Sequence, residues 1–286
     1  MDDTMFCPVK INITLRVLNQ REDGYHELFS AFWKKKGTEG LTIRRCSDEN
    51  REDMLNVTGA VIEGENILHK VLAAARRFAP DLPAFDISLE KEYPQGSGIG
   101  AGSGNAAALV DFFRDKYGFF RSGEEITRLG ADVAFLCCGS EVAFAGGVGE
   151  KLKPQTDIKG LCWTLAFPTW QSNTRAAYAS LDRFRAKDGW TARSFEACEA
   201  EARAITDKLR RGERAGLLPN DFTEVLLAEH GEYAAAFDAS AAGSLAWGLC
   251  GSGSAVFAVC DGRADAERAA RVFKAFDWIN KTSILE

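Results

Sequence analysis

One glycine-rich segment, residues 94–108, constrains this chain more than any other. It reads Pro-Gln-Gly-Ser-Gly-Ile-Gly-Ala-Gly-Ser-Gly-Asn-Ala-Ala-Ala and places five glycines within nine residues. A strand-like run (84–89) precedes it, and an alanine-rich run that predicts a helix over 103–116 follows. Glycine lets backbone N–H groups approach an anion closely, and a helix N-terminus adds unpaired donors and a positive dipole end. The segment therefore predicts a phosphate-binding loop rather than a flexible linker.

Two common nucleotide-binding loops fit this segment poorly. A Walker A loop requires a Gly-Lys pair, and the sequence contains none. The dinucleotide fingerprint has a formal match at Gly96, Gly98 and Ala101. That motif requires a second strand ending in an acidic residue about 20 residues later, whereas residues 111–129 favour more helix. A nicotinamide-binding fold therefore stays a minor alternative.

Strand-like and helical patterns are mixed along the whole chain. Alternating apolar residues predict a half-buried strand over 10–18, and helical spacing predicts a helix over 67–78 that ends before a proline. Further strands are predicted over 41–45, 84–89, 142–145, 162–167 and 255–259, and further helices over 174–181, 194–211, 220–237 and 264–275. This mixture indicates an α+β fold. The length of 286 residues allows two domains, and the polar stretch 154–160 suggests their boundary, so we expect domains over 1–157 and 158–286.

Composition argues against several classes of protein. The net charge of −6 disfavours a nucleic-acid binder, and the basic run Lys34–Lys36 is interpreted as solvated surface. No apolar run reaches the roughly 18 residues of a membrane span, and the acidic start does not resemble a signal peptide. The eight cysteines contain no Cys-x-x-Cys pair. We therefore expect a cytoplasmic protein with reduced, mostly buried thiols and no structural zinc.

Three segments in order resemble the motifs of the GHMP kinases, a family of small-molecule kinases. The glycine-rich loop is similar to the family's Pro-x-x-x-Gly-Leu-Gly loop, Cys7–Ile13 to its Pro-x-Lys-x-Asn-Leu motif, and Gly248–Phe257 to its third motif. Residues 21–28 also resemble the Arg-x-Asp-Gly-Tyr-His signature of the 4-diphosphocytidyl-2-C-methyl-D-erythritol kinases. Further matches to that branch of the family are Gly-Ala-Asp-Val at 130–133, the glycine-rich run 144–150 and the Asn-Asp pair at 220–221.

This resemblance implies both a fold and an activity. The fold would be a two-domain GHMP-kinase fold, with an N-terminal domain like ribosomal S5 domain 2 and a ferredoxin-like C-terminal domain. The activity would be transfer of a phosphoryl group from ATP, with Mg²⁺, to the 2-hydroxyl of 4-diphosphocytidyl-2-C-methyl-D-erythritol in the non-mevalonate route to isoprenoid precursors. The partner is then a small cytidine-diphosphate-linked sugar alcohol, and the enzyme is a monomer or homodimer. Alternatives are a homoserine- or mevalonate-type kinase of the same family, or a non-catalytic nucleotide sensor.

The resemblance also implies roles for individual residues. Asp132 matches the family's catalytic base and Lys10 the lysine beside it. Without the resemblance, Asp132 is equally typical of a helix N-cap, and Lys10 could extend from a half-buried strand to water. The residues expected to bind ATP are Lys91, Pro94, Gly96, Gly98, Gly100, Gly102, Ser103, Gly104 and Asn105. The residues expected to bind the substrate are Asn12, Tyr25, His26, Phe32, Thr174 and Asn220.

The sequence departs from the family pattern at three places. Gly104 replaces the second serine that is usual in the glycine-rich loop, so a hydroxyl directed at phosphate or Mg²⁺ must come from Ser103 or be absent. The run 32–37 replaces an Asp-rich turn, and Cys250 and Ser252 stand where threonines are frequent. These departures leave Lys10 and Asp132 in place, but the metal ligands stay unassigned.

Overall fold

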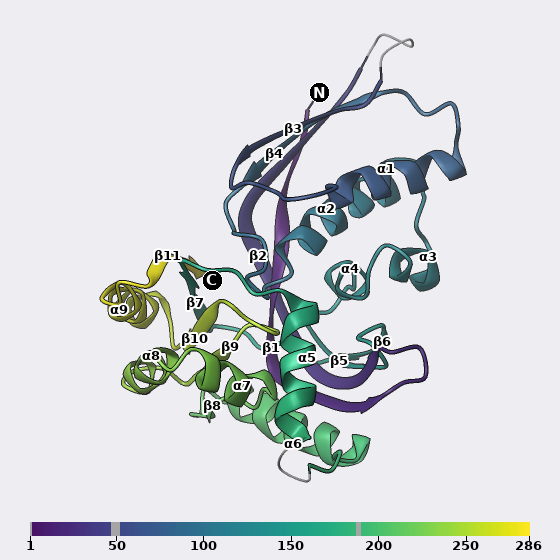
Figure 1. The fold of residues 1–286 in the computed structure, drawn as a ribbon. Helices are drawn as coiled ribbons and strands as arrows, with labels where there is room; N and C mark the ends of the chain where they lie inside the picture. Colours follow the sequence, from purple (N-terminus) through teal and green to yellow (C-terminus); the bar gives the residue numbers. More distant parts are fainter. Residues whose placement is uncertain (1, 47–51, 187–189) are drawn as a thin grey trace. The chain divides into compact units, whose positions relative to one another are not determined.

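The computed structural model describes residues 2–46, 52–186 and 190–286, which form a mixture of strands and helices (Figure 1). The chain divides into two compact units that are discontinuous in sequence. Unit 1 contains the chain up to Val9 together with Lys36–Gln95 and Gly100–Gly139, and unit 2 contains Lys10–Lys35, Gly96–Ile99 and Ser140–Glu286. The long strands β1 (Asp3–Gln20) and β2 (His26–Arg45) each contribute residues to both units. The sequential boundary expected at 157/158 stays a prediction.

Unit 1 combines strands with a layer of helices. β4 lies between β3, which runs parallel to it, and the C-terminal half of β2, which runs antiparallel. The elements that lie wholly in this unit are β3 (Met54–Gly59), α1 (Ile67–Phe78), β4 (Phe85–Lys91), α2 (Ala101–Tyr117), α3 (Gly123–Thr127) and α4 (Ala131–Leu136). Helix α2 packs against both α1 and α4. The helices predicted over 67–78 and 103–116 are confirmed.

The alternation of β4 fixes how this unit packs. Phe85, Ile87 and Leu89 are buried, while the residues between them are more exposed, because successive side chains of a strand point to opposite faces. The ring of Phe85 contacts Phe112 and Phe113 of α2 edge to face, with centroids 5.8 and 5.5 Å away. One face of β4 therefore forms the base on which α2 rests.

Unit 2 contains a five-stranded sheet in the order β11-β7-β10-β9-β8. Its strands are β7 (Cys162–Pro168), β8 (Gly216–Leu217), β9 (Ala246–Leu249), β10 (Val256–Cys260) and β11 (Ile279–Leu285). Its helices are α5 (Thr174–Arg185), α6 (Phe195–Arg210), α7 (Phe222–Glu229), α8 (Tyr233–Ser240) and α9 (Arg263–Lys274). The N-terminal half of β2 pairs separately with β5 (Val142–Gly146), which pairs with β6 (Lys151–Gln155).

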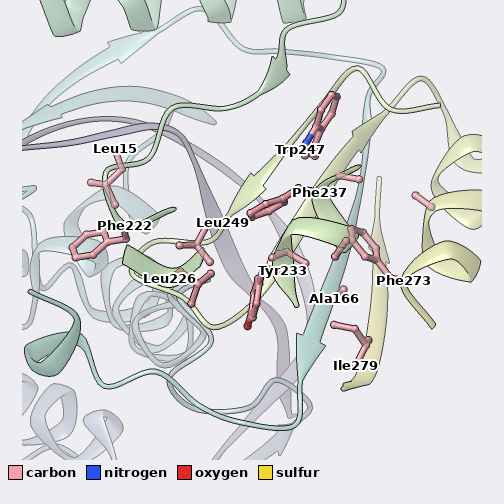
Figure 2. Packing of buried hydrophobic residues seen from close by; sticks show 14 of the residues in the cluster. Leu15, Ala166, Phe222, Leu226, Tyr233, Phe237, Trp247, Leu249, Phe273 and Ile279 are labelled. Atoms are coloured by element: carbon pink, nitrogen blue, oxygen red, sulfur yellow. The ribbon is translucent and has the colours of Figure 1, made fainter. Parts of the chain in front are cut away.

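The core of unit 2 lies between this sheet and the helices (Figure 2). Phe237 of α8 and Phe273 of α9 are buried with Trp247 and Leu249 of β9. Tyr233 is fully buried, and its hydroxyl donates a hydrogen bond to the Ser254 carbonyl oxygen at 2.8 Å. The loop after β9, which carries the third motif, is thus held by the core itself.

One predicted feature is wrong, and a second holds for only part of its segment. The helix expected over 220–237 is two helices, α7 and α8, with residues 230–232 between them. The run Lys34–Lys36 belongs to β2, where Lys36 is exposed as predicted but Lys34 and Lys35 are half-buried. The Lys35 ammonium lies 5.5 and 5.6 Å from the ring centroids of Trp33 and Trp163. Burial lowers the pKa of Lys35. The long apolar stem of a basic side chain can pack on aromatic rings even within a strand. The composition of the run alone does not show that such rings lie next to it.

Two general features bear on the class of protein. All eight cysteines lie in the described ranges, and no disulfide joins them there. Over those same ranges, each helix is too short or too polar to span a bilayer.

Candidate active site

Strand β1 carries a row of buried polar side chains in unit 2. Lys10, Asn12 and Thr14 are at most 5% exposed. The Lys10 ammonium donates to Asn12 Oδ1 at 3.0 Å, and Asn12 Nδ2 donates to Ser30 Oγ at 2.8 Å. Ser30 in turn donates to the Thr14 carbonyl oxygen at 2.6 Å. Because buried polar groups need partners, this chain of hydrogen bonds fixes the orientation of the Lys10 ammonium.

The first and third motifs meet at Asn12. The Gly251 N–H donates to Asn12 Oδ1 at 3.1 Å, so one amide oxygen serves both Lys10 and the third motif. A Cβ built on Gly251 would lie 3.5 Å from Lys10 Nζ. The predicted site residues Lys10 and Asn12 therefore lie against the loop that follows β9.

The first half of the glycine-rich loop, Gly96–Ile99, is held by the same two motifs. The Gly96 carbonyl oxygen accepts from Ser254 N at 3.0 Å and Ser172 N at 3.1 Å, and the Ile99 oxygen accepts from Lys10 N at 2.9 Å. Gly98 has φ +80°, and a Cβ there would lie 1.9 Å from the Cys250 carbonyl oxygen. Only glycine fits this position. Three motifs far apart in the sequence thus form one hydrogen-bonded assembly in unit 2.

The second half of the glycine-rich loop begins α2 in unit 1. Gly100 is the N-cap in a left-handed conformation, and no side chain of the described residues caps the helix. Ser103 is half-buried, Gly102 is exposed, and a Cβ on Gly102 would meet nothing within 4 Å. The first-turn N–H groups of a helix are unpaired within the helix and form an anion site. This end of α2 has the chemistry of a phosphate site.

The departure at Gly104 has a steric cause. A Cβ at this position would lie 1.8 Å from the Pro8 carbonyl oxygen of β1. The glycine lets α2 and β1 approach closely. A serine would need one of the two to move, so Ser103 is the hydroxyl that this turn offers.

Asp132 lies in the first turn of α4, also in unit 1. It is half-buried, and Val133, Phe135 and Leu136 of the same helix are buried. Helix α4 packs against α2, the helix that carries the predicted phosphate-binding turn. Asp132 thus belongs to an element anchored on α2. That its carboxylate acts with Lys10 of unit 2 stays a prediction.

The predicted substrate residues differ widely in exposure. Tyr25 is 68% exposed, whereas Phe32 is 3% exposed and its ring centroid lies 5.3 Å from Lys10 Nζ. His26 Nε2 lies 2.8 Å from Asp182 Oδ1, and its ring stacks on Tyr178 with centroids 5.0 Å apart. Tyr178 and Asp182 are both on α5, four residues apart, so they share one helix face. Sequence reasoning missed both residues.

Asn220 and Asp221 connect elements of unit 2. Asn220 Nδ2 donates to the carbonyl oxygens of Leu249 at 3.1 Å and Gly251 at 2.8 Å, so Asn220 supports the third motif. Asp221 forms ion pairs with Arg16 of β1 and Arg185 of α5 at 2.7 and 2.6 Å. Thr174, at the start of α5, is exposed and lies 3.4 Å from Ser252 of the third motif, hydroxyl to hydroxyl.

Two side chains of unit 1 carry buried polar atoms and lie in or before segments that lead into the predicted nucleotide loop. Lys91 is buried, and its ammonium contacts the Glu39 carboxylate at 2.6 Å. Asn66 caps α1 through its Oδ1, while its Nδ2 is buried with no hydrogen-bond partner among the described residues. The segment before Asn66 is tied to the glycine-rich loop, because Glu63 N donates to Gln95 Oε1 at 2.9 Å. A buried donor without a partner could bind an acceptor atom of a ligand. The sequence indicates only that Asn66 is a residue type favoured as the N-cap of the helix that follows.

The cysteine of the third motif is fully buried. Burial raises the pKa of the Cys250 thiol to about 12. A thiol is nucleophilic as the thiolate, so Cys250 stays neutral and acts as a small buried apolar group.

The described residues contain no group of three or more His, Cys, Asp or Glu side chains able to hold a metal ion. Mg²⁺ in phosphoryl-transfer enzymes is usually held by one or two protein ligands together with the substrate phosphates. Such a site needs no three-residue cluster. Asp132 and Ser103 in unit 1 supply oxygen donors of the right kind.

The chain matches two family models. Residues 66–146 match the GHMP kinases N terminal domain, and residues 199–277 match the GHMP kinases C terminal domain. A 4-diphosphocytidyl-2-C-methyl-D-erythritol kinase from Moorella thermoacetica is 33% identical over 273 residues, covering 92% of this chain and 90% of that protein. One of the same name from Porphyromonas gingivalis is 29% identical, covering 96% and 97%.

Solved structures agree with these matches. A crystal structure of 4-(cytidine 5'-diphospho)-2C-methyl-D-erythritol kinase superposes with a TM-score of 0.80 at 27% identity, covering 100% of this chain and 98% of that one. A homoserine kinase from Cytophaga hutchinsonii gives a TM-score of 0.61 at 15% identity, covering 100% and 94%. The second likeness concerns the fold alone.

Proposed function

Because the chain belongs to the 4-diphosphocytidyl-2-C-methyl-D-erythritol kinase family of the GHMP kinases, we propose that it phosphorylates the 2-hydroxyl of 4-diphosphocytidyl-2-C-methyl-D-erythritol. ATP is the phosphoryl donor, and the reaction is a step of the non-mevalonate route to isoprenoid precursors. The observation that carries the proposal is the contact of three motifs in unit 2. Asn12 joins Lys10 to Gly251, and Gly96–Ile99 is bonded to both of these segments.

The first requirement of phosphoryl transfer is a held triphosphate. The N-terminal turn of α2 supports this role, because it offers unpaired N–H groups and an exposed Gly102. Mg²⁺, when bound, would neutralise charge on the phosphate oxygens, and Ser103 is the hydroxyl of this turn available to it. Within unit 2, hydrogen bonds to the carbonyl oxygens of Gly96 and Ile99 hold the preceding part of the loop.

The second requirement is stabilisation of the charge on the transferring group. Lys10 suits this role, because its ammonium is buried and oriented by Asn12. A pre-oriented cation in a water-poor site needs no reorganisation during the reaction. The acceptor oxygen forms a bond to the γ-phosphorus while the bond to the bridging oxygen of ADP breaks.

The third requirement is a group that takes the proton of the acceptor hydroxyl. We assign this role to Asp132. Its half-buried side chain lies in the first turn of α4, which packs against α2, the helix whose N-terminal turn is proposed to bind phosphate, and both helices belong to unit 1. A positioned general base contributes about 10²–10⁴ in rate.

The cytidine group is assigned to the surface around His26. Tyr178 and Asp182 hold the His26 ring between a stacked aromatic face and a carboxylate. A carboxylate partner fixes the tautomer of an imidazole, which fits it to hydrogen-bond the edge of a base. Tyr25 immediately precedes His26 in the sequence. It is exposed, so its ring can stack on that base.

A direct assay tests this proposal. The enzyme is given ATP with 4-diphosphocytidyl-2-C-methyl-D-erythritol, homoserine or mevalonate in parallel, and ADP release is followed. We expect turnover with the first acceptor alone. Turnover with homoserine or mevalonate instead would contradict the substrate assignment, and ATP binding without turnover on any acceptor would favour a nucleotide sensor. We also propose a cytoplasmic location, which the absence of disulfides among the described residues supports.

A further inference from the structure

Unit 1 contains a fully buried carboxylate that the proposed reaction does not use. Glu39 of β2 is 0% exposed. Its Oε1 accepts from Lys91 Nζ at 2.6 Å, Tyr93 N at 2.8 Å and Glu92 N at 3.1 Å, and its Oε2 accepts from Asn105 Nδ2 at 2.6 Å. Both carboxylate oxygens therefore accept hydrogen bonds, three on Oε1 and one on Oε2, as a buried carboxylate requires.

The strand register places this carboxylate on the core side of the sheet. On β2 and β4, Leu41 pairs with Leu89 and Gly40 with Glu90, and the next pair along the same register is Glu39 with Lys91. Both side chains therefore continue buried rows that are otherwise apolar. A buried ion pair contributes little net stability compared with apolar residues of similar volume. Stability alone gives little reason for its presence.

The partners of Glu39 lie on both flanks of the glycine-rich loop. Tyr93 is the last residue before Pro94, where the loop begins, and Asn105 lies in the second turn of α2, just after the loop ends. One carboxylate oxygen thus fixes the strand that enters the loop, and the other fixes the helix that leaves it. A single side chain thus bridges the two flanks of the loop.

We propose that Glu39 is a positioning residue that holds the glycine-rich loop in its nucleotide-binding conformation. This inference rests on the proposed function in one respect, that the loop binds the phosphates of ATP. A loop with fixed ends loses less conformational freedom when it binds a ligand, which raises affinity. Lys91 then serves chiefly as the counter-ion of Glu39.

The test uses Glu39→Gln with Glu90→Gln as the matched control. Glu90 precedes Lys91 on the same strand, but it is exposed. The substitution keeps the size of the side chain, but it replaces one carboxylate oxygen by an amide NH2 group. That group cannot accept the hydrogen bonds that Asn105, or Lys91, Glu92 and Tyr93, now donate. Calorimetry measures the Kd of ADP with Mg²⁺, and hydrogen exchange measures protection of the amides over 92–106 in the ligand-free protein.

We expect Glu39→Gln to raise the Kd of ADP and the KM of ATP by about tenfold or more, with kcat changed far less. Exchange over 92–106 should accelerate, and Glu90→Gln should behave as the wild type. A purely structural role would lower the melting temperature and leave the Kd and the exchange unchanged, which would overturn the proposal. Nucleotide affinity is measured without an acceptor, so a failure of the cytidyl substrate assay would be distinguishable from a failure of this inference.

Glu39→Asp covers the case in which the glutamine variant does not fold. The aspartate keeps a negative charge opposite Lys91, but its side chain is one methylene group shorter. We therefore expect it to lose its hydrogen bonds to at least one flank of the loop. The folded aspartate variant should also bind ADP more weakly and exchange faster over 92–106. Wild-type affinity and exchange in this variant would contradict the proposal.

Discussion

At the scale of single residues, Asn12 has the most demanding position. Its amide accepts from Lys10 Nζ and Gly251 N and donates to Ser30. Asn12→Ala leaves a buried ammonium and a buried N–H group without this acceptor. We expect the free energy of unfolding to fall by about 2–4 kcal/mol and kcat to fall at least tenfold, measured by urea denaturation and by ADP release.

The control for this prediction is Asn56→Ala. Asn56 also donates from its side chain to another residue, Asp86 at 3.2 Å, but it is exposed on β3. Its loss should change stability by less than about 0.5 kcal/mol. Equal effects of the two substitutions would mean that Asn12 does not orient the Lys10 ammonium.

Tyr25 is 68% exposed, so we expect its substitution to affect substrate binding but not stability. Tyr25→Ala should leave the melting temperature unchanged and raise the KM of the cytidyl substrate by about tenfold, through loss of base stacking worth about 1–3 kcal/mol. The KM of ATP should stay the same. Phe6→Ala, which removes another exposed ring of 51% exposure, is the control and should change neither constant. A proportional rise of both KM values would argue against a role in cytidine binding.

Sequence reasoning reached the residues of the motifs but not their partners. Lys10, Asn12 and Asn220 were predicted as site residues from short patterns, and the structure places all three around the third motif. Tyr178 and Asp182, which hold His26, were missed. They lie more than 150 residues further along the chain, and no local pattern links a histidine in a turn to one face of a distant helix.

At the scale of elements, the contact between α2 and β1 gives a steric prediction. A Cβ at Gly104 would lie 1.8 Å from the Pro8 oxygen, which is backbone and cannot rotate away. Gly104→Ala should therefore destabilise the protein by about 1–3 kcal/mol, as overpacking does. Thermal unfolding measures it, with Gly123→Ala as control, because a Cβ at Gly123 meets nothing within 4 Å. A wild-type melting temperature for Gly104→Ala would show that the close approach is not required.

Periodicity predicted the type of most elements and underestimated some of their lengths. The helix over 67–78 was predicted with its observed bounds, because an apolar stripe and a following proline define it. The strand predicted over 41–45 is the end of β2, which begins at His26. Lysines and Glu39 interrupt the apolar pattern of β2, and they are tolerated because aromatic rings and Lys91 accompany them. Such compensation depends on neighbouring strands and is absent from a single segment.

At the scale of the whole molecule, the buried thiols should make the free energy of unfolding fall at alkaline pH. Burial raises the pKa of Cys7 and Cys250 to about 12 and that of Cys260 to about 11, from 9.0. The folded state keeps these protons while the unfolded state loses them above pH 9. Their contribution is therefore complete below pH 9 and is lost as the pH rises toward 11–12, at about 1.4 kcal/mol per pH unit for each thiol.

Urea unfolding of the wild type and Cys260→Ala at pH 8 to 10.5 measures this effect. We expect the free energy of unfolding to fall less steeply with pH in the variant than in the wild type. Cys46→Ala removes a less buried thiol and should keep a slope nearer to that of the wild type. Parallel slopes for wild type and Cys260→Ala would contradict the prediction.

The order of the motifs along the chain indicated the fold and the kinase family, and the comparisons confirm both. The discontinuous division into two units was not predicted, because β1 and β2 each contribute to both. Strand pairs distant in sequence determine that division, and composition shifts such as residues 154–160 do not report them. Glu39 was overlooked for the same reason.

The most direct measurement of the central claim is a double-mutant cycle on Lys10 and Asp132, with kcat and the Kd of ADP measured for Lys10→Met, Asp132→Asn and the double variant. Asp115→Asn, an exposed change on α2, serves as the control. If the two groups act as a unit on the transferred phosphoryl group, each single change should lower kcat by about 10²–10⁴, and the double variant should be no slower than the slower single one. Asp132→Asn should leave the Kd of ADP nearly unchanged. Single losses that multiply in the double variant, or full turnover in Asp132→Asn, would contradict the account.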